Sequence, residues 1–301
     1  MIAIIGSGLV GSSIAFLCAS NSLTDIVLLN RTKSKAKGEA LDISNAIPRN
    51  SDIMVSGTDD YRKIKDAEII VIAASTGIYQ KNRNEIIHAQ VKMIKSIAKK
   101  IKKHCSSPTI LMVSNPVDVL TYFFQKEIRY PREKVIGIAS SLDSSRFRHI
   151  ISCQTKAKYS TISDVHVLGE HGDSMVPVFS KAKVNGKRLS ELINPEQAKK
   201  IRKDVCDYWK SLRNFKSRSQ FGIAKNVYNV LDAIVKNHQV NLEASVLLRG
   251  EFGQKDICMG MPVKISINGI EKIKSMKLDS SEIKLLEESA RTIRKNIQSV
   301  K

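Results

Sequence analysis

The sequence predicts an α/β protein in which a doubly wound parallel sheet is followed by an α+β region. Up to about residue 140, short apolar, β-branched runs alternate with longer helix-like stretches. Beyond that point the alternation stops, and strand-like segments and long amphipathic helices follow in irregular order. We therefore expect two domains, residues 1–140 and residues 141–301. Because the sequence shows no internal repeat and no flexible linker between them, we expect the two domains to pack directly on each other.

The predicted strands of the first half are short and β-branched, and Gly, Asn or Pro flanks them, which is typical of strands buried on both faces. They are Ile2–Ile5, Asp25–Leu29, Ile53–Ser56, Glu68–Ala73, Thr109–Val113 and Lys134–Ile138. The helix-like stretches between them are Gly8–Ala19, Lys33–Asn45, Asn84–Lys103 and Val117–Glu127. Such alternation favours a parallel sheet, because parallel strands need crossover connections.

The second half is expected to mix helices with shorter strands. The expected elements are a helix at Ser144–Cys153, strands around Ile162–Val167 and Val176–Lys183, helices at Gln197–Asn214 and Gln220–Asn237, strands at Ala244–Leu248 and Cys258–Ile267, and a last helix from Ser280. This order is typical of an α+β domain.

Length and composition indicate a globular protein of the cytoplasm. The 301 residues are 42% apolar, and no apolar run approaches the roughly 20 residues that a membrane span needs. The apolar opening segment lacks a basic start and is interrupted by glycines, so we do not expect a secretory signal. The five cysteines are irregularly spaced without a C-x-x-C pair, which predicts reduced thiols.

The formal net charge of +20 is unusual and raises nucleic-acid binding as an alternative function. The lysines are scattered, however, and no aromatic residues interleave with a basic stripe to make a stacking platform. We therefore interpret the charge as a solvated surface that attracts anionic substrates, and expect neither a nucleic-acid nor a membrane partner.

The segment Gly6-Ser-Gly8-Leu-Val-Gly11 follows the first predicted strand and opens the first predicted helix. In this context a G-x-G-x-x-G pattern predicts a dinucleotide site. Gly6 permits the tight turn, Gly8 lets the backbone approach a pyrophosphate, and Gly11 allows close contact of helix and strand. This is the Rossmann arrangement, and it predicts a nicotinamide dinucleotide, NAD(P)H, as the cofactor.

The second strand of such a site usually ends in an acidic residue, about 20 residues further on, that binds the ribose 2′-hydroxyl of NAD. Here that position is Asn30, followed by Arg31. A neutral amide does not repel a 2′-phosphate and the adjacent cation can bind one, so we expect NADPH to be accepted or preferred. The alternative is that these residues form a basic turn and NAD is used.

Three further segments, 113–118 (VSNPVD), 141–147 (SLDSSRF) and 169–177 (GEHGDSMVP), follow in order. With them the chain resembles the lactate/malate dehydrogenase family from end to end. The resemblance implies hydride transfer between NAD(P)H and a small 2-oxo or 2-hydroxy acid. It also implies a homodimer or a homotetramer.

The chemistry requires a proton for the carbonyl oxygen, and a histidine suits this because its pKa lies near neutrality. His171, in a polar loop between glycines, is the candidate, and the resemblance assigns it the acid/base role. By the same resemblance Asp143 orients His171 and stabilises its imidazolium. Taken alone, Asp143 could instead be the N-cap of the helix expected at Ser144.

The resemblance assigns substrate contacts to three other residues. Arg146 matches the arginine that clamps the substrate carboxylate, which a planar guanidinium does with two parallel hydrogen bonds. Asn115 matches a residue that contacts both substrate and cofactor, and Ser219 matches a Ser/Thr of the substrate pocket. Alone, Arg146 would be interpreted as a surface ion pair and Asn115 as a turn residue before proline.

The loop after Gly77 departs from the family pattern, because it is about three residues shorter than usual. Arg83 matches the arginine that polarises the substrate carbonyl, and Gln80 falls on the position that discriminates substrates. Glutamine there accompanies pyruvate in the family, whereas arginine accompanies oxaloacetate. Lys81 could supply the positive charge, and residues 174–177 (SMVP) resemble malate dehydrogenases. We expect a dicarboxylic substrate, malate or oxaloacetate, with lactate or pyruvate as the alternative.

No metal site is expected, because the spacing of His166 and His171 matches no zinc-ligand pattern. An inactive relative that keeps only the fold is a further alternative. The complete set of His171, Asp143 and Arg146 argues against it, because loss of catalysis would allow at least one of them to change.

Overall fold

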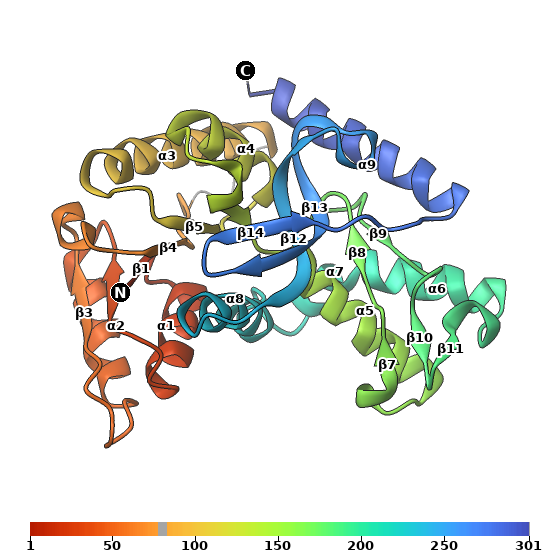
Figure 1. Ribbon diagram of the computed structural model, residues 1–301, viewed down its shortest axis with the longest axis horizontal. Coiled ribbons are helices and arrows are strands. Elements are labelled where there is room, and N and C mark those ends of the chain that lie inside the picture. The colour runs from red at the N-terminus through yellow and green to blue at the C-terminus, as the bar shows by residue number, and fades with distance from the viewer. Residues whose placement is uncertain (78–82, 301) are drawn as a thin grey trace.

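A mixed sheet of nine strands organises the residues that the computed structural model describes, which are 1–77 and 83–300, without the side chains of residues 83–85. The strand order is β14-β13-β12-β6-β5-β4-β1-β2-β3 (Figure 1). The strands from β6 to β3 are all parallel, which confirms the predicted doubly wound sheet.

The parallel strands form where the sequence is most apolar. Their bounds are β1 Ile2–Ile5, β2 Ile26–Leu29, β3 Val55–Thr58, β4 Ile69–Ile72, β5 Thr109–Met112 and β6 Val135–Gly137. Strands β1, β2, β4 and β5 are buried at every position. The strand predicted at 53–56 lies two residues later, because the parallel register pairs Leu28 with Gly57 and Leu29 with Thr58.

Helices cover both faces of these strands. They are α1 Leu9–Ser20, α2 Lys33–Ser44, α3 Arg83–His104 and α4 Val117–Ile128. Helices α3 and α4 pack together on one face, while α1 lies on the other face against α8, Phe221–Val235 (Figure 1). Within the described residues, none of the helices combines the length and the apolar character that crossing a membrane requires.

The second half of the chain extends the same sheet. Strand β12, Val240–Arg249, runs antiparallel to β6 with Ser245 opposite Gly137. Strands β13, Lys255–Ser266, and β14, Gly269–Ile273, complete it. Strand β14 was not predicted, since it is short and has exposed charged residues. The main core contains buried side chains from both halves of the chain, which pack on this one sheet.

A second apolar cluster lies beneath helix α5, Ser140–Thr155. The other elements of the second half are β7 Ile162–Ser163, β8 Val167–Leu168, β9 Val176–Pro177, β10 Lys183–Val184, β11 Lys187–Arg188, α6 Pro195–Cys206, α7 Tyr208–Arg213 and α9 Ser280–Gln298. The single helix expected at 197–214 is wrong, because the chain breaks at Asp207, whose carboxylate binds Lys203 and Lys210.

Candidate active site

The glycine turn between β1 and α1 leaves no room for side chains at two of its positions. Gly6 has a φ of +107°, and a Cβ on it would lie 2.7 Å from the backbone of Ala73. A Cβ on Gly11 would lie 1.9 Å from the carbonyl oxygen of Gly6. Gly8, the N-cap of α1, faces open space instead, and no side chain caps the helix there. The open space and uncapped N–H groups suit the pyrophosphate of a dinucleotide.

Asn30 is tied to this glycine turn. Its Nδ2 donates to Ser7 Oγ at 2.9 Å, and its Oδ1 accepts from the Thr32 N–H at 3.0 Å. The residue directly follows β2, and Arg31 beyond it is exposed. The carboxyl edge of β2, where a ribose would bind in a Rossmann site, therefore presents an amide and a cation.

The carboxylate of Asp143 joins two other predicted site residues. One oxygen lies 2.5 Å from Nδ1 of His171, and the other accepts from Nη1 of Arg146 at 3.0 Å. Asp143 is fully buried in the first turn of α5. The alternative that it caps a helix at Ser144 is wrong, because α5 begins at Ser140. Since a carboxylate only accepts, Nδ1 donates and Nε2 remains the nitrogen for proton exchange.

The surroundings of His171 favour its protonated form. Burial alone lowers the pKa of the imidazole, but the charge and hydrogen bond of Asp143 and the charge of Asp118 outweigh burial and Arg146. The net result is a pKa above the ordinary histidine value. A histidine held in this way can donate a proton to a carbonyl oxygen near neutral pH.

Arg146 is buried, so the interpretation of an isolated Arg146 as a surface ion pair is wrong. Its guanidinium stacks on the ring of Tyr208, with Cζ 5.0 Å from the ring centroid. Stacking on one side and the Asp143 hydrogen bond on another restrict the guanidinium plane. Such a group is prepared to bind a carboxylate with two parallel hydrogen bonds.

No described hydrogen bond connects the predicted residues Asn115 and Ser219 to His171, Asp143 or Arg146. Asn115 is exposed between β5 and α4, and its Oδ1 accepts from the Val117 N–H at 3.2 Å. Ser219 is half-buried just before α8, whose Gly222 packs against Leu142 of α5. No described contact of Ser219 reaches His171.

Two predicted substrate residues cannot be placed. Gln80 lies outside the described residues, as does the neighbouring Lys81. Arg83 is the first residue of α3, but its side chain is also outside the description.

Sequence reasoning missed Asp118 and Ser245. The buried Asp118 carboxylate accepts from the His171 backbone N–H at 2.8 Å and from Ser245 Oγ at 2.6 Å. Asp118 belongs to the segment at 113–118 that was recognised, which was the one available signal. Ser245 comes from β12 and had no local signal.

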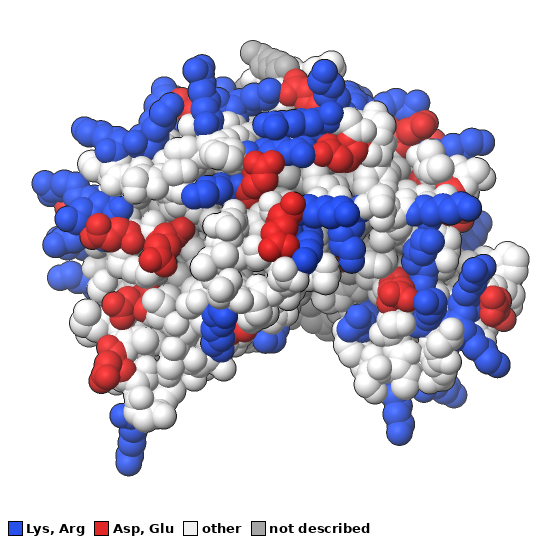
Figure 2. Space-filling model, viewed as in Figure 1, with Lys and Arg blue, Asp and Glu red and all other residues white. Residues whose placement is uncertain are grey.

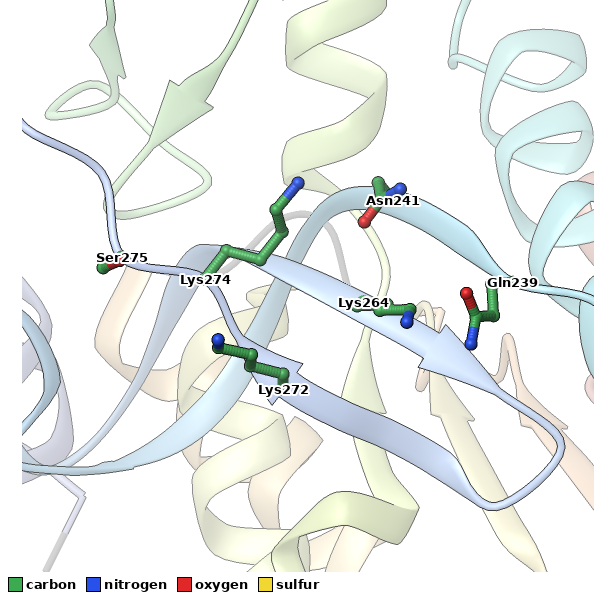
Figure 3. A pocket seen from close by; sticks show the side chains of 6 residues that line it. All are labelled: Gln239, Asn241, Lys264, Lys272, Lys274 and Ser275. Carbon is green, nitrogen blue, oxygen red and sulfur yellow. The ribbon is translucent and has the colours of Figure 1, made fainter.

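A separate pocket of about 490 Å³ lies on β12, β13 and the segment around β14 (Figure 3), and the predicted site residues are not among those that line it. Its lining is polar and basic: Gln239, Asn241, Lys264, Lys272, Lys274 and Ser275. Lys264 extends toward Gln239 while Lys272 points the other way, so their ammonium groups do not converge on one ligand (Figure 3). Lys264 also pairs with Glu271 at 3.1 Å. The chemistry described above lies elsewhere.

Neither a patch of surface charge on the face that Figure 2 shows nor a cluster of metal ligands marks a further site in the described part of the chain. Lys and Arg are spread over the visible face with Asp and Glu among them, rather than gathered in one stripe (Figure 2). In the part of the chain that the structure describes, no three His, Cys, Asp or Glu side chains gather as metal ligands would. His166 pairs instead with Glu243, Nδ1 to Oε1, at 2.6 Å.

Two family models together match nearly the whole chain. The model of the lactate/malate dehydrogenase NAD-binding domain matches residues 1–137, and the model of the alpha/beta C-terminal domain of the same family matches residues 140–301. The malate dehydrogenase of Bacillus mycoides is 35% identical over 309 residues, covering 99% of this chain and 97% of the relative. That of Bacillus cytotoxicus is 33% identical, covering 97% and 96%.

Solved structures agree with these matches. The lactate dehydrogenase of Cryptosporidium parvum, complexed with lactic acid and nicotinamide adenine dinucleotide, superposes with a TM-score of 0.94 at 33% identity, covering 99% of this chain and 97% of that chain. The malate dehydrogenase of Aeropyrum pernix gives a TM-score of 0.93 at 28% identity, with coverages of 99% and 98%.

Proposed function

Since this chain belongs to the lactate/malate dehydrogenase family, we propose that it is a malate dehydrogenase, which transfers a hydride reversibly between NAD(P)H and oxaloacetate. The observation that carries the proposal is the Asp143 carboxylate, which binds a proton donor, His171, with one oxygen and a carboxylate clamp, Arg146, with the other. Reduction of a 2-oxo acid needs both groups at adjacent substrate atoms.

Each of the predicted site residues has its own role in the proposed reaction. Arg146 binds the 1-carboxylate, and Arg83 polarises the 2-oxo group, as the family resemblance implies. The bound nicotinamide supplies the hydride. His171, held through Nδ1 by Asp143, gives its Nε2 proton to the oxygen as the carbonyl is reduced, and Asp143 stabilises the imidazolium before that transfer. In the oxidation of malate the neutral imidazole accepts the same proton.

The choice of a dicarboxylic substrate is supported by the relatives named malate dehydrogenase and by the residues 174–177 (SMVP) beside His171. Gln80 supports the second candidate, lactate dehydrogenase, since glutamine at the family's discriminating position accompanies pyruvate. Lys81 is the cation that we propose for the distal carboxylate of oxaloacetate. Both loop residues lie outside the described part of the chain.

For the cofactor, we propose that NADPH is accepted or preferred. The support is the Asn30 amide beside the glycine turn, with the exposed Arg31 next to it. An acidic residue at Asn30 would repel a 2′-phosphate, whereas the amide does not.

We also propose a homodimer or homotetramer in the cytoplasm. Large apolar side chains are exposed on helices α1, α2 and α8 or at their ends, and α1 contacts both other helices. They are Leu9, Phe16, Leu41 and Phe221. Exposed apolar groups of this kind mark contact surfaces. The described cysteines are all free thiols, as in a reducing compartment. Sedimentation equilibrium of the purified chain distinguishes monomer, dimer and tetramer.

The test of function is an initial-rate assay of oxaloacetate and of pyruvate, each with NADH and with NADPH, at fixed ionic strength. Turnover dominated by oxaloacetate is expected, and turnover dominated by pyruvate would make the chain a lactate dehydrogenase. The His171→Ala variant should lose turnover by roughly 10²- to 10⁴-fold, the contribution of general acid–base catalysis, while cofactor binding measured by fluorescence stays unchanged. Retained turnover would refute the role of His171.

A further inference from the structure

We propose that Asp118 is a positioning residue for His171, which anchors the loop of that histidine and supplies a second negative charge beside it. The family resemblance assigns only Asp143 to His171. Asp118 therefore adds a second carboxylate to the group. The inference deepens the proposed function and rests on it only where turnover is measured.

The contacts of Asp118 join three distant parts of the chain. The residue lies in the first turn of α4, and its side chain is only 3% exposed. Its Oδ2 accepts from the backbone N–H of His171 at 2.8 Å, and its Oδ1 accepts from Ser245 Oγ of β12 at 2.6 Å. Both carboxylate oxygens are used, so the side chain has one orientation.

The Ser245 side of the anchor is rigid. Ser245 pairs with Gly137 across the β12–β6 junction, where a Cβ on the glycine would lie 2.8 Å from the Ser245 Cβ. Helix α4 packs on both strands. Asp118 and Ser245 thus tie the His171 backbone to the central sheet. Asp143 ties the His171 ring to α5.

A buried carboxylate is a costly way to hold a peptide. Burial raises the pKa of the Asp118 carboxyl to about 6, although the Ser245 and His171 hydrogen bonds lower it. A neutral amide could make hydrogen bonds in the same place without that desolvation penalty. Near neutral pH the carboxylate form predominates, and the negative charge is the property that an amide would not supply.

Several titratable groups surround Asp118 and His171, and together they determine how the negative charge of Asp118 affects the His171 ring. Asp143 and Arg146 of α5 face His171, and the charge of Asp118 acts on the same ring. Glu170 lies close enough to act on Asp118, and its own carboxylate binds Ser174 and Asn296. Cys258 of β13 faces Asp118 as a neutral thiol, because burial raises its pKa well above the usual range. When Arg146 pairs with a substrate carboxylate, its positive charge destabilises the His171 imidazolium less. The negative charges of Asp118 and Asp143 then stabilise the imidazolium with less opposition from Arg146.

The test is the Asp118→Asn variant. Its Oδ1 can accept from the His171 N–H while its Nδ2 donates to Ser245 Oγ, so the shape is kept and the charge is lost. We expect the titration midpoint of the His171 ring, followed by ¹⁵N NMR, to fall by roughly one pH unit. The pH profile of kcat/KM for malate oxidation should move down with it, because that direction needs the neutral imidazole. An Asp118→Asn midpoint equal to that of the unmodified chain would overturn the proposal.

Two control variants separate this effect from others. Asp204→Asn removes the same charge from an exposed pair with Lys200 on α6 and should leave the His171 midpoint unchanged. An equal shift there would overturn the proposal, because any charge would then suffice. Ser245→Ala keeps the Asp118 carboxyl but removes the hydrogen bond that lowers its pKa, so the His171 midpoint should fall by less than in Asp118→Asn. A fall as large as in Asp118→Asn would show that packing, not charge, matters.

A further measurement needs no variant and no turnover. The ¹³Cγ chemical shift of Asp118 in the unmodified chain reports the protonation of its carboxyl, and it should be that of a carboxylate near neutral pH. A carboxyl that keeps its proton near neutral pH supplies no charge beside His171 and overturns the proposal even if Asp118→Asn does not fold. If the chain reduces neither oxaloacetate nor pyruvate, the proposed function is wrong. Both NMR measurements still test the proposed role of Asp118, because they need no turnover.

Discussion

Arg146 donates a hydrogen bond to Asp143, Nη1 to Oδ1 at 3.0 Å, from one turn further along the same helix. The second oxygen of that carboxylate binds His171. One buried side chain therefore orients both the group that would bind the substrate and the group that would protonate it. A change at Arg146 should affect substrate binding first and, through Asp143, the histidine second.

The Arg146→Lys variant should lose catalytic efficiency without losing the fold. Lysine keeps the positive charge but cannot make two parallel hydrogen bonds or stack as a plane on Tyr208. Loss of a hydrogen bond to a charged group is worth about 1.5–3 kcal/mol, so kcat/KM for oxaloacetate should fall by roughly 10- to 150-fold. Steady-state kinetics measure this, and the dissociation constant of the reduced cofactor, which should not change, serves as the control. A variant with unchanged KM and kcat would exclude Arg146 from the substrate site.

Two glycines of the dinucleotide turn should respond oppositely to alanine. A Cβ on Gly11 would lie 1.9 Å from the Gly6 oxygen, so Gly11→Ala should lower the free energy of unfolding by about 3 kcal/mol. Gly8 faces open space, so Gly8→Ala should change it by less than about 1 kcal/mol. Only the affinity for NAD(P)H should then fall, by about tenfold, because the new methyl group occupies the pyrophosphate position. Urea unfolding and fluorescence titration measure the two quantities. Unimpaired cofactor binding by Gly8→Ala would contradict this assignment.

Asn30→Asp should move the cofactor preference toward NADH. An aspartate can accept from Ser7 Oγ and from the Thr32 N–H, so the local hydrogen bonds survive the change. Repulsion of about 1.4 kcal/mol between the carboxylate and a 2′-phosphate would raise the ratio of kcat/KM for NADH over NADPH about tenfold. Arg31→Gln is the companion variant and should weaken NADPH binding alone. An unchanged ratio in both variants would mean that residues 30 and 31 do not contact the ribose.

Asp118 should make the stability of the fold depend on pH. The native carboxyl holds its proton up to about pH 6, whereas the ordinary Asp pKa is 3.8, so protonation favours the native state. That stabilisation is complete below about pH 4 and is lost as pH rises through about 6. Relative to Asp118→Asn, the free energy of unfolding of the unmodified chain should fall by about 2 kcal/mol between pH 4 and pH 7. Urea unfolding of both proteins across this range measures the difference, and a constant difference would contradict the raised pKa.

Much of the fold could be predicted because its signals are local. The buried parallel strands are continuous β-branched runs, and the turn between β1 and α1 needs glycine for steric reasons that two or three residues express. Errors arose where a local pattern had two solutions. Helix α5 begins at Ser140 although the serines there resemble a loop, and the break at Asp207 interrupts one amphipathic pattern.

The sequence by itself determined the doubly wound sheet, the dinucleotide turn and the identity of His171, Asp143 and Arg146 as candidates, since these are encoded in short segments. The tertiary structure alone decided that β12 to β14 join the same sheet, and that Asp118 and Ser245 lie behind His171. Asp118 is 53 residues from His171, and Ser245 is 127 residues from Asp118. Contacts at such separations depend on how complete helices and strands pack, and no local spacing of residues specifies that packing.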